Sequence, residues 1–319
     1  MYVVIGGTGF LGSYIVREIQ KQTAEKIIVA SRKQIQPFLS VEENHDGNIL
    51  HISEIEHRLY GRVRDGGGWI KCDILNHSDL DKLIQIINSI EEPCKIIYLS
   101  AYLHPDLVEE NPWISWNMNV ISLEYLLSRL KKCESFVFAS TDSVYGESLN
   151  HYHFKEADRL NPVNLYGVQK TAGEAIVYHY GYHSVRYPLL IGPSITEGRP
   201  HFYDTIVDNL KQGIKTEMFF DSIRSTLDFE TAAALTIRLL ENHKSRMPPI
   251  LNVSGDEELS KFDLGIRIAK RLALPEDLII PVSVYDEQKI YRAKRAACTL
   301  MDNSVLKHIL SQEYIRAKL

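Results

Sequence analysis

The chain has 319 residues, of which 45% are hydrophobic and 24% charged, and its formal net charge is −5. This composition is typical of a globular protein, and the length suits one α/β unit or two domains sharing a core. The small negative charge without a basic run argues against a nucleic-acid partner. No apolar segment approaches the roughly 20 residues that cross a bilayer, so we expect no membrane contact.

Strand-length apolar runs alternate with helical patterns from the N-terminus onward. Such alternation predicts an α/β fold: a Rossmann doubly wound parallel sheet with helices on both faces. The apolar start lacks a charged segment and meets glycines at once, so we expect a strand there and no signal peptide. Expected strands are 2–5, 26–30, 70–73, 95–100, 135–140 and 184–191, and expected helices are 10–22, a segment capped by Ser78 and ending at Asn88, much of 111–132, and 166–180.

Two segments break this alternation. Residues 34–69 form an insertion, in which 51–63 could be an added helix and Asp65, Gly66, Gly67 and Gly68 a turn. After Gly192 the pattern loosens, which predicts a smaller C-terminal α/β substrate domain. We expect a Rossmann domain at 1–191, joined by a returning segment at about 226–245, and a substrate domain made of 192–225 and 246–319.

The glycines Gly6, Gly9 and Gly12 directly follow the first expected strand and open the first expected helix. Glycine at this spacing permits a tight turn, close approach of the backbone to a pyrophosphate, and close packing of helix on strand. The free N–H groups and positive dipole end of the helix then face the phosphates. We therefore predict a dinucleotide site formed by this turn together with Thr8, Phe10 and Leu11.

The end of the second expected strand reads Ala30, Ser31, Arg32, Lys33. A site specific for NAD usually places a carboxylate here, which would repel a 2′-phosphate. Arg32 can instead hold that phosphate bidentately while Ser31 donates a hydrogen bond. This predicts NADP(H) as cofactor. NAD(H) stays an alternative, because Arg32 and Lys33 could simply begin an exposed loop.

Tyr166 and Lys170 are spaced i and i+4, so they lie on one face of the expected helix. An ammonium beside a phenol favours the phenolate, so we expect Lys170 to lower the pKa of Tyr166. Thr141, at the end of the fifth expected strand, could hydrogen-bond the same substrate oxygen. Next to a nicotinamide, these residues predict carbonyl reduction, with hydride from the cofactor and a proton from Tyr166. The alternative is a chance surface pair.

These motifs resemble those of the extended short-chain dehydrogenase/reductases over essentially the whole chain. The glycine turn, Asp73, Asn119, Thr141 and the pair Tyr166/Lys170 stand where that family has them. The resemblance implies that Thr141 and Tyr166 grip the reacting oxygen and that Lys170 also holds the nicotinamide ribose. It further places Asp73 and Ile74 by the adenine and Ser100, Ala101 and Asn119 along the cofactor.

The segments around Thr141 and from Asn161 to Glu174 are most similar to dTDP-4-dehydrorhamnose reductases. Ser143 stands where 4,6-dehydratases have a glutamate, and Asp142 where 4-epimerases have a small apolar residue. The resemblance thus implies an NADPH-dependent reductase of a 4-keto nucleotide-sugar. Asp142, Ser143 and Arg224 are its expected substrate-binding residues, Arg224 reaching the diphosphate; Arg292 and Arg295 echo a basic segment of the same reductases, and Gln169 departs from the usual serine or threonine.

Two alternatives to a reductase stay open. An epimerase would keep its nicotinamide bound and return the hydride, and a regulatory subunit would retain the fold without turnover. Family members commonly dimerise, so we expect a homodimer through the helices within 111–132 and 166–180. The cysteines Cys72, Cys94, Cys133 and Cys298 show no CxxC pair and no histidine at metal-ligand spacing, so we expect no metal, and free thiols in a reducing cytoplasm.

Overall fold

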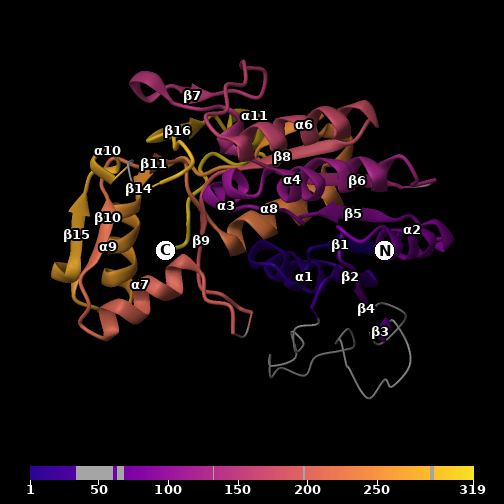
Figure 1. Ribbon diagram of the computed structural model, residues 1–319, viewed down its shortest axis with the longest axis horizontal. Coiled ribbons are helices and arrows are strands. Elements are labelled where there is room, and N and C mark those ends of the chain that lie inside the picture. The colour runs from indigo at the N-terminus through magenta and orange to yellow at the C-terminus, as the bar shows by residue number, and fades with distance from the viewer. Residues whose placement is uncertain (34–59, 63–67, 132, 197, 288–290) are drawn as a thin grey trace.

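The computed structural model describes residues 1–33, 60–62, 68–131, 133–196, 198–287 and 291–319. Its centre is an eight-stranded sheet in the order β13-β8-β6-β5-β1-β2-β4-β3, parallel except for β3 at one edge (Figure 1). This is the predicted Rossmann-type sheet. Its strands are β1 (Tyr2–Ile5), β2 (Ile27–Ser31), β3 (Tyr60–Arg62), β4 (Gly68–Lys71), β5 (Lys95–Tyr98), β6 (Ser135–Thr141), β8 (His183–Tyr187) and β13 (Ile250–Asn252).

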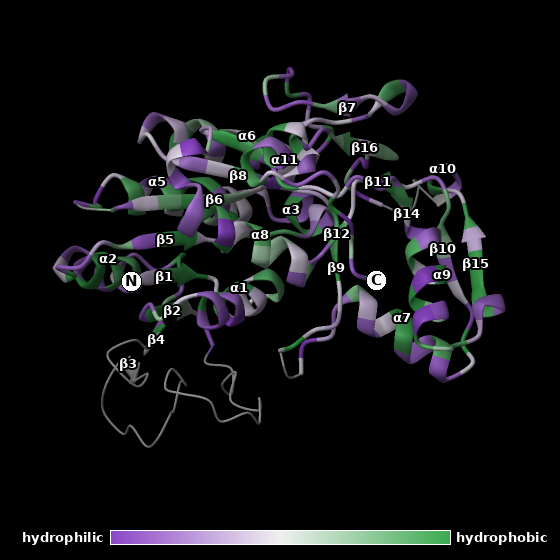
Figure 2. Ribbon diagram, turned by 180° about the vertical axis from the view of Figure 1, so that it is seen from behind, coloured by the Kyte–Doolittle hydropathy of each residue, from purple (hydrophilic) through white to green (hydrophobic). Residues whose placement is uncertain are grey.

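Two apolar cores lie on the two faces of this sheet. Successive side chains of a strand point to opposite faces. Accordingly Tyr2 and Val4 join the first core, and Val3 and Ile5 the second. In Figure 2 the apolar strands run between the helical layers. The first core is covered by α1 (Phe10–Gln22), α8 (Phe229–Asn242) and α11 (Ser304–Leu310), and the second by α2 (His77–Ser89), α5 (Ser122–Leu127) and α6 (Leu165–His179).

The helix expected within 111–132 is built from three successive segments. α4 (Pro112–Trp116) leads into a π-helical stretch, η1 (Asn117–Ile121), which continues as α5. A π-helical turn inside a helix frequently marks a functional site. Here it carries Asn119. The shorter α3 (Pro105–Glu110) precedes these segments.

A smaller lobe follows β9 and lies beside the carboxyl ends of the main strands (Figure 1). Its separate core includes Leu210, Leu264 and Ile268. The lobe contains α7 (Phe202–Lys211), β10 (Thr216–Phe219), α9 (Lys261–Arg271) and β15 (Ile279–Val282). Beside it, β14 (Leu259–Ser260), β11 (Ile223–Arg224), β16 (Cys298–Met301) and β7 (His153–Phe154) form a four-stranded sheet.

Short elements complete the described chain. β9 (Leu190–Ile191) pairs with β12 (Leu227–Asp228). β13 and α11, which come from segment 246–319, belong to the main sheet and its first core. We propose on this basis that the substrate domain is centred on the third core alone. The remaining elements are η2 (Asp142–Val144), η3 (Leu149–His151), η4 (Lys244–Arg246), η5 (Glu276–Leu278) and α10 (Val284–Glu287).

Some local expectations were wrong. Asn76, and not Ser78, caps α2, because the Asn76 side chain accepts a hydrogen bond from the Ser78 backbone N–H. Within the segment 51–63 the described residues 60–62 form strand β3, paired with β4, and the rest lies outside the described residues. Gly68 begins β4 and is not part of a turn. The single strand expected at 184–191 is divided into β8 and β9.

Candidate functional site

The glycine turn lies between β1 and α1 and has the shape that a dinucleotide phosphate requires. Gly6 has a φ of +87°, and a Cβ on it would lie 2.9 Å from the backbone nitrogen of Ser100. A Cβ on Gly12 would lie 2.3 Å from the carbonyl oxygen of Gly6. Gly9 precedes α1, and no described side chain caps this helix. The open N–H groups at the start of α1 therefore fit an anionic cofactor group.

This turn sits at the point where the order of strands reverses. β2 and β4 lie to one side of β1, and β5 and β6 to the other. Ligands of open α/β sheets bind in the crevice outside the carboxyl ends of the strands at such a point. Gly6 after β1, Ser100 and Ala101 after β5, and Thr141 at the end of β6 all lie at this edge. The structure thus brings the expected cofactor turn and the expected catalytic hydroxyl to one edge.

The residues expected near the ribose phosphate differ in their surroundings. Ser31 is buried, and its hydroxyl accepts a hydrogen bond from Trp69 Nε1 (2.8 Å) and donates one to the carbonyl of Lys33 (3.0 Å). Arg32 is exposed at the end of β2. The Ser31 hydroxyl is thus committed to the protein. Arg32 is therefore the better placed of the two to meet a ribose phosphate.

The side-chain amide of Asn119 forms hydrogen bonds within the protein through both its oxygen and its nitrogen. Its side chain accepts a hydrogen bond from the Tyr102 N–H (2.7 Å) and donates to the Tyr102 carbonyl (3.0 Å) and to Gln169 Oε1 (2.6 Å). Only 1% of the residue is exposed. The amide therefore anchors the loop after β5, which carries Ser100 and Ala101, against the helix layer. Its effect on a cofactor acts through that loop.

Other residues expected in the cofactor site have mixed exposure. Asp73 is half-buried, and one of its carboxylate oxygens accepts the N–H of Leu75 (3.1 Å). Ile74 is buried in the second core, and Thr8 is buried within the glycine turn. Phe10 and Leu11 are partly buried against the first core. Asp73 is therefore the polar side chain that the fold leaves partly open beside the adenine edge.

Gln169 is a buried polar residue that forms a bridge between helices. Its side chain is fully buried, accepts from Asn119 and donates to Ser115 Oγ (2.9 Å). The departure from serine or threonine at this position was visible in the sequence, but its partners were not. Gln169 thus ties α6 to the segment α4–η1, directly beside Lys170.

Lys170 is buried at the base of the candidate active site. Its ammonium donates to the carbonyl of Ala139 (2.8 Å) and lies 4.5 Å from the ring centroid of Phe138. The ring centroid of Tyr166 lies 5.9 Å away. Burial lowers the pKa of Lys170 to about 7, although the negative charge of Glu174 acts to raise it. Near neutral pH this side chain therefore exchanges its proton readily.

Tyr166 does not have the lowered pKa expected from its spacing to Lys170. Burial, and then the charge of Asp142, raise the pKa of its phenol. The expected direction was wrong because a charge four residues away counts for less than removal of the phenol from water. Tyr166 is held close to β6, since a Cβ on Gly167 would lie 2.5 Å from the carbonyl oxygen of Ser143. The phenol is therefore protonated near neutral pH.

Thr141, Asp142 and Ser143 form one hydrogen-bonded group at the end of β6. The Thr141 hydroxyl donates to Asp142 Oδ1 (3.1 Å) and accepts from the Ser143 N–H (3.2 Å). The Ser143 hydroxyl also donates to Asp142 (3.3 Å). Burial raises the pKa of Asp142, with the charge of Arg224 opposing it. Asp142 is therefore a buried carboxyl group that hydrogen bonds from Thr141 and Ser143 hold in place.

Arg224 reaches this group from the smaller lobe. Its Nε lies 3.4 Å from Asp142 Oδ2. Its terminal nitrogens donate to the backbone carbonyls of Ile223 (2.7 Å), Ala297 (2.6 Å) and Ala296 (2.7 Å). The three residues expected to bind substrate thus converge. However, Arg224 has most of its donors occupied by the protein.

A buried ion pair that the sequence did not reveal supports this arrangement. Arg186 on β8 donates from Nε (2.8 Å) and Nη2 (2.6 Å) to Glu174, and from Nη1 to the Tyr145 hydroxyl (2.6 Å). The Ser140 hydroxyl also donates to Glu174. Lys170 and Glu174 therefore hold the consecutive residues Ala139 and Ser140. The end of β6, and with it Thr141, is clamped to α6.

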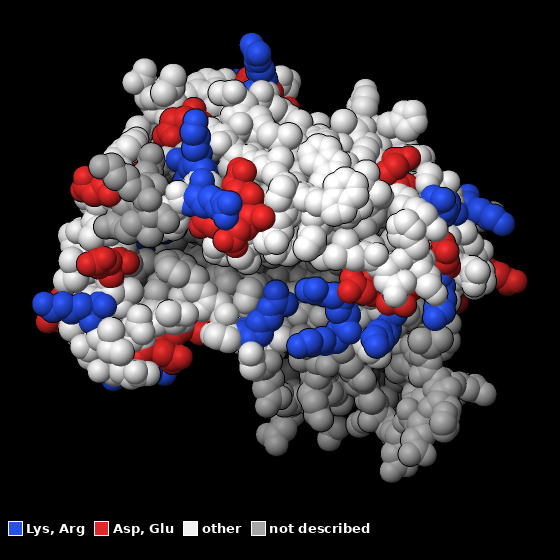
Figure 3. Space-filling view, in the orientation of Figure 1, with Lys and Arg blue, Asp and Glu red and all other residues white. Residues whose placement is uncertain are grey.

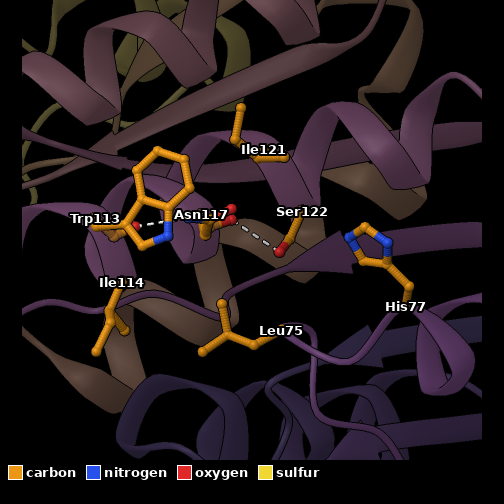
Figure 4. Close-up of a pocket in the computed structure, with 7 residues that line it drawn as sticks. All are labelled: Leu75, His77, Trp113, Ile114, Asn117, Ile121 and Ser122. Atoms are coloured by element: carbon orange, nitrogen blue, oxygen red, sulfur yellow. Dashed lines mark hydrogen bonds between the residues drawn. The ribbon is translucent and has the colours of Figure 1, made fainter.

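A separate surface pocket lies away from the catalytic residues (Figure 4). Trp113, Ile114 and Ile121 border it on α4 and η1, with Leu75 and His77 opposite. Asn117 donates to the Trp113 carbonyl (2.8 Å) at its centre. The pocket is shallow and largely apolar. It belongs to the outer surface of the helix layer rather than to the crevice.

The fold and this edge of the sheet define a dinucleotide-binding α/β protein with a tyrosine–lysine pair beside the expected nicotinamide position. The model of the NAD dependent epimerase/dehydratase family matches residues 2–254. The chain belongs to this family, which confirms the resemblance drawn from its motifs. The family binds NAD(P) and consists mostly of NAD(P)-dependent oxidoreductases.

Individual relatives are distant. A dTDP-D-glucose 4,6-dehydratase of Dictyostelium discoideum is 25% identical over 294 residues, covering 83% of this chain and 61% of that protein. Methionine adenosyltransferase 2 subunit beta of Danio rerio is also 25% identical over 294 residues, covering 88% and 76%. The chain thus spans less than two thirds of the first of these relatives.

Solved structures share the fold. A dTDP-4-dehydrorhamnose reductase from Bacillus anthracis in complex with NADP superimposes with a TM-score of 0.73 at 19% identity, covering 99% of this chain and 94% of that one. A UDP-glucuronic acid 4-epimerase from Bacillus cereus, in complex with UDP-glucuronic acid and NAD, gives 0.74 at 20% identity, covering 98% and 94%. Among the described residues no helix is long and apolar enough to cross a membrane.

Proposed function

We propose that this protein is an NADPH-dependent reductase of a 4-keto nucleotide-sugar. The observation that carries the proposal is the position of Tyr166 on α6, which packs against β6 and η2 where Thr141 lies; burial and the charge of Asp142 raise the pKa of its phenol. Reduction of a carbonyl needs a proton donor, whereas an epimerase must begin by removing a proton. A raised tyrosine pKa therefore favours reduction as the first step.

Each side chain of the candidate site has its own role in the proposed reduction. Tyr166 donates the proton to the carbonyl oxygen, and Thr141 hydrogen-bonds the same oxygen. Lys170, buried with a pKa of about 7, is the group that would return a proton to the phenol after the transfer, and it would also hold the ribose of a bound cofactor. A bound NADPH supplies the hydride. Asp142 orients the sugar by binding one of its hydroxyl groups.

Replacing Tyr166 tests this mechanism. Tyr166→Phe removes the proton donor and nothing of the glycine turn, so kcat should fall by roughly 10²-fold or more while NADPH affinity stays unchanged. NADPH oxidation with 4-keto nucleotide-sugars gives kcat, and quenching of protein fluorescence gives the affinity. Tyr314→Phe, at an exposed tyrosine near the C-terminus, is the matched control. Turnover close to the parent rate in Tyr166→Phe rules the mechanism out.

A regulatory subunit without turnover is the second candidate. It is favoured by the similarity to methionine adenosyltransferase 2 subunit beta, found in several vertebrates at 23–26% identity. Retention of Thr141, Tyr166 and Lys170 supports an enzyme instead. A panel of dTDP-, UDP-, GDP- and CDP-linked keto-sugars that elicits no NADPH oxidation, from protein that binds NADPH, favours the subunit.

We also infer a homodimer formed through the outer faces of α4–η1–α5 and α6. These faces carry exposed apolar side chains, which in a monomer would be an unusual contiguous patch. A two-fold axis between two copies would cover the same patch on both. The residues concerned are Trp113, Ile114 and Ile121 on the first segment and Val168 and Tyr178 on α6.

We propose a reducing compartment, the cytoplasm, as the location. All four cysteines are free thiols, and Cys72, Cys94 and Cys298 are buried. Burial raises the pKa of the Cys72 thiol to about 12, so it is a poor nucleophile. Such thiols serve packing and are protected from oxidation in a reducing environment.

A further inference from the structure

Lys261 is a half-buried cation at the first position of α9, in the smaller lobe. Its backbone is fixed by the capping box of Ser260 and Asp263. Its ammonium lies 5.2 Å from the ring centroid of Phe219 and 5.9 Å from that of Phe202. Among the described residues no carboxylate lies within 4 Å of it, and its three N–H donors have no hydrogen-bond partner. Lys261 is thus a cation without a counterion.

Its neighbours make this isolation costly. Burial, followed by the positive charges of Arg224 and Arg295, lowers the pKa of Lys261 to about 8. The two arginines have acidic partners of their own: Asp142 for Arg224 (3.4 Å) and Asp106 for Arg295 (2.7 Å). Aromatic rings offset part of the repulsion but supply no negative charge. Repulsion among the positive charges of this cluster destabilises the fold, and a bound anionic ligand would offset that repulsion.

The position of the cluster shows which part of a ligand would fill it. Arg224 connects it through Asp142 to Thr141, and the charge of Asp142 acts on Tyr166. Lys261 is therefore linked to the candidate active site through the charges of Arg224 and Asp142. The glycine turn follows β1 of the main sheet, whereas Lys261 begins α9 and Arg224 ends β11; Figure 3 shows a hollow between the smaller lobe and the rest of the molecule. The pyrophosphate of the cofactor is therefore expected at the glycine turn and not at this cluster.

We propose that Lys261 binds the diphosphate of the nucleotide-sugar and determines the requirement for a diphosphate-linked substrate. This rests on the proposed function, and it assigns to Lys261 what the sequence had assigned to Arg224. The terminal nitrogens of Arg224 donate hydrogen bonds to the carbonyls of Ile223, Ala296 and Ala297. Arg224 would therefore act on a diphosphate mainly through its positive charge. Lys261 has all its donors available. Arg295 adds a further positive charge that acts on Lys261.

Binding of nucleoside diphosphates tests the proposal without turnover. dTDP and UDP are titrated calorimetrically into protein held in excess NADP, which occupies the dinucleotide site. Lys261→Met keeps the stem that packs on the aromatic rings but removes the charge, so affinity should fall roughly 10- to 100-fold. Lys261→Arg should stay within a few-fold of the parent. Lys270→Met, an exposed lysine of the same helix, should leave affinity unchanged.

A second measurement separates this role from a structural one. Without ligand, Lys261→Met should raise the melting temperature, because it removes repulsion from Arg224 and Arg295. A purely structural lysine would lower it. Parent-like affinity in Lys261→Met, a lowered melting temperature, or no binding of either nucleotide to the parent protein overturns the proposal. Loss of binding in Lys261→Met, in a protein that reduces no keto-sugar, overturns the proposed reaction and leaves the diphosphate site standing.

Discussion

The surroundings of Lys170 and Tyr166 disfavour the charged form of both side chains. Burial lowers the pKa of the lysine and raises that of the tyrosine, so both tend toward neutrality near pH 7 to 8. A neutral phenol can donate a proton, and a lysine that titrates near pH 7 can replace it. The pair is therefore arranged for delivering a proton rather than for holding a phenolate.

The burial of Lys170 makes stability depend on pH. The folded chain releases this proton near pH 7, while the unfolded chain keeps it until about pH 10.5. Between these values the unfolded state binds more protons, so the free energy of unfolding rises with pH. Urea unfolding of the parent and of Lys170→Met at pH 6.5, 8 and 9.5 isolates this group. Their difference should move in favour of the parent by at most about 1.4 kcal/mol per pH unit. A difference that is independent of pH contradicts it.

Arg32 decides the cofactor preference if the ribose phosphate lies at the end of β2. Arg32→Ala should raise KM for NADPH by roughly tenfold or more, the loss of a charge-assisted bond, with little change for NADH. Steady-state kinetics with both cofactors measures this. Lys33→Ala is the neighbouring control. Equal KM for NADPH in parent and Arg32→Ala means that Arg32 is only a loop residue.

At the scale of elements, α6 organises the site by presenting successive turns to different partners. Tyr166 faces the end of β6, Lys170 and Glu174 hold Ala139 and Ser140, and Gln169 reaches sideways to η1. The close approach at Gly167 leaves no room for a side chain. The helix thus fixes both the catalytic edge and the π-helical turn.

Gln169 should matter for stability more than an exposed glutamine. Gln169→Ala removes one hydrogen bond each from the buried side chains of Asn119 and Ser115, which keep their bonds to the backbone; the unsatisfied Asn119 N–H costs about 1–3 kcal/mol in the free energy of unfolding. Denaturant unfolding measures the loss, and Gln85→Ala, which removes an exposed glutamine of α2, should change little. A Gln169→Ala variant as stable as the parent shows that water or rearrangement satisfies these groups.

At the scale of the whole molecule, the crevice lies between the main sheet and the smaller lobe. β13 and α11 return to the main sheet after the lobe, so the lobe is held at both ends. Arg224 and Asp142 come from opposite sides of the crevice and meet at 3.4 Å. Substrate binding between these two sides would compete with that contact.

The outer helix layer should hold two copies together. Trp113 is 78% exposed on α4, and a dimer would bury it. Trp113→Asp should convert a dimer into a monomer because it places a charge in an apolar interface. Light scattering after size-exclusion chromatography gives the mass. Tyr285→Asp, at an aromatic residue of α10 that is 62% exposed, should leave the mass unchanged. A parent protein of monomeric mass contradicts the dimer.

Much of the fold followed from short-range patterns. The bounds of β1 and α1 were predicted to the residue, because a glycine turn and a 3.6-residue periodicity are local properties. Thr141, Tyr166 and Lys170 were likewise recognisable from their spacing and neighbours. The cap of α2 was not predicted, since several polar residues nearby could have capped the helix equally well. The π-helical turn was not predicted either.

The sequence by itself determined the class of fold and the glycine turn, and it singled out Thr141, Tyr166 and Lys170, whose catalytic role stays a prediction; each of these signals depends on residues a few positions apart. Tertiary structure decided the proton affinities of Tyr166 and Lys170, because burial and the charges of Asp142 and Glu174 set them. It also decided that Arg224 is bound by backbone carbonyls and that Lys261 has no carboxylate within 4 Å among the described residues. Electrostatic free energies depend on distances and burial that only the folded chain establishes.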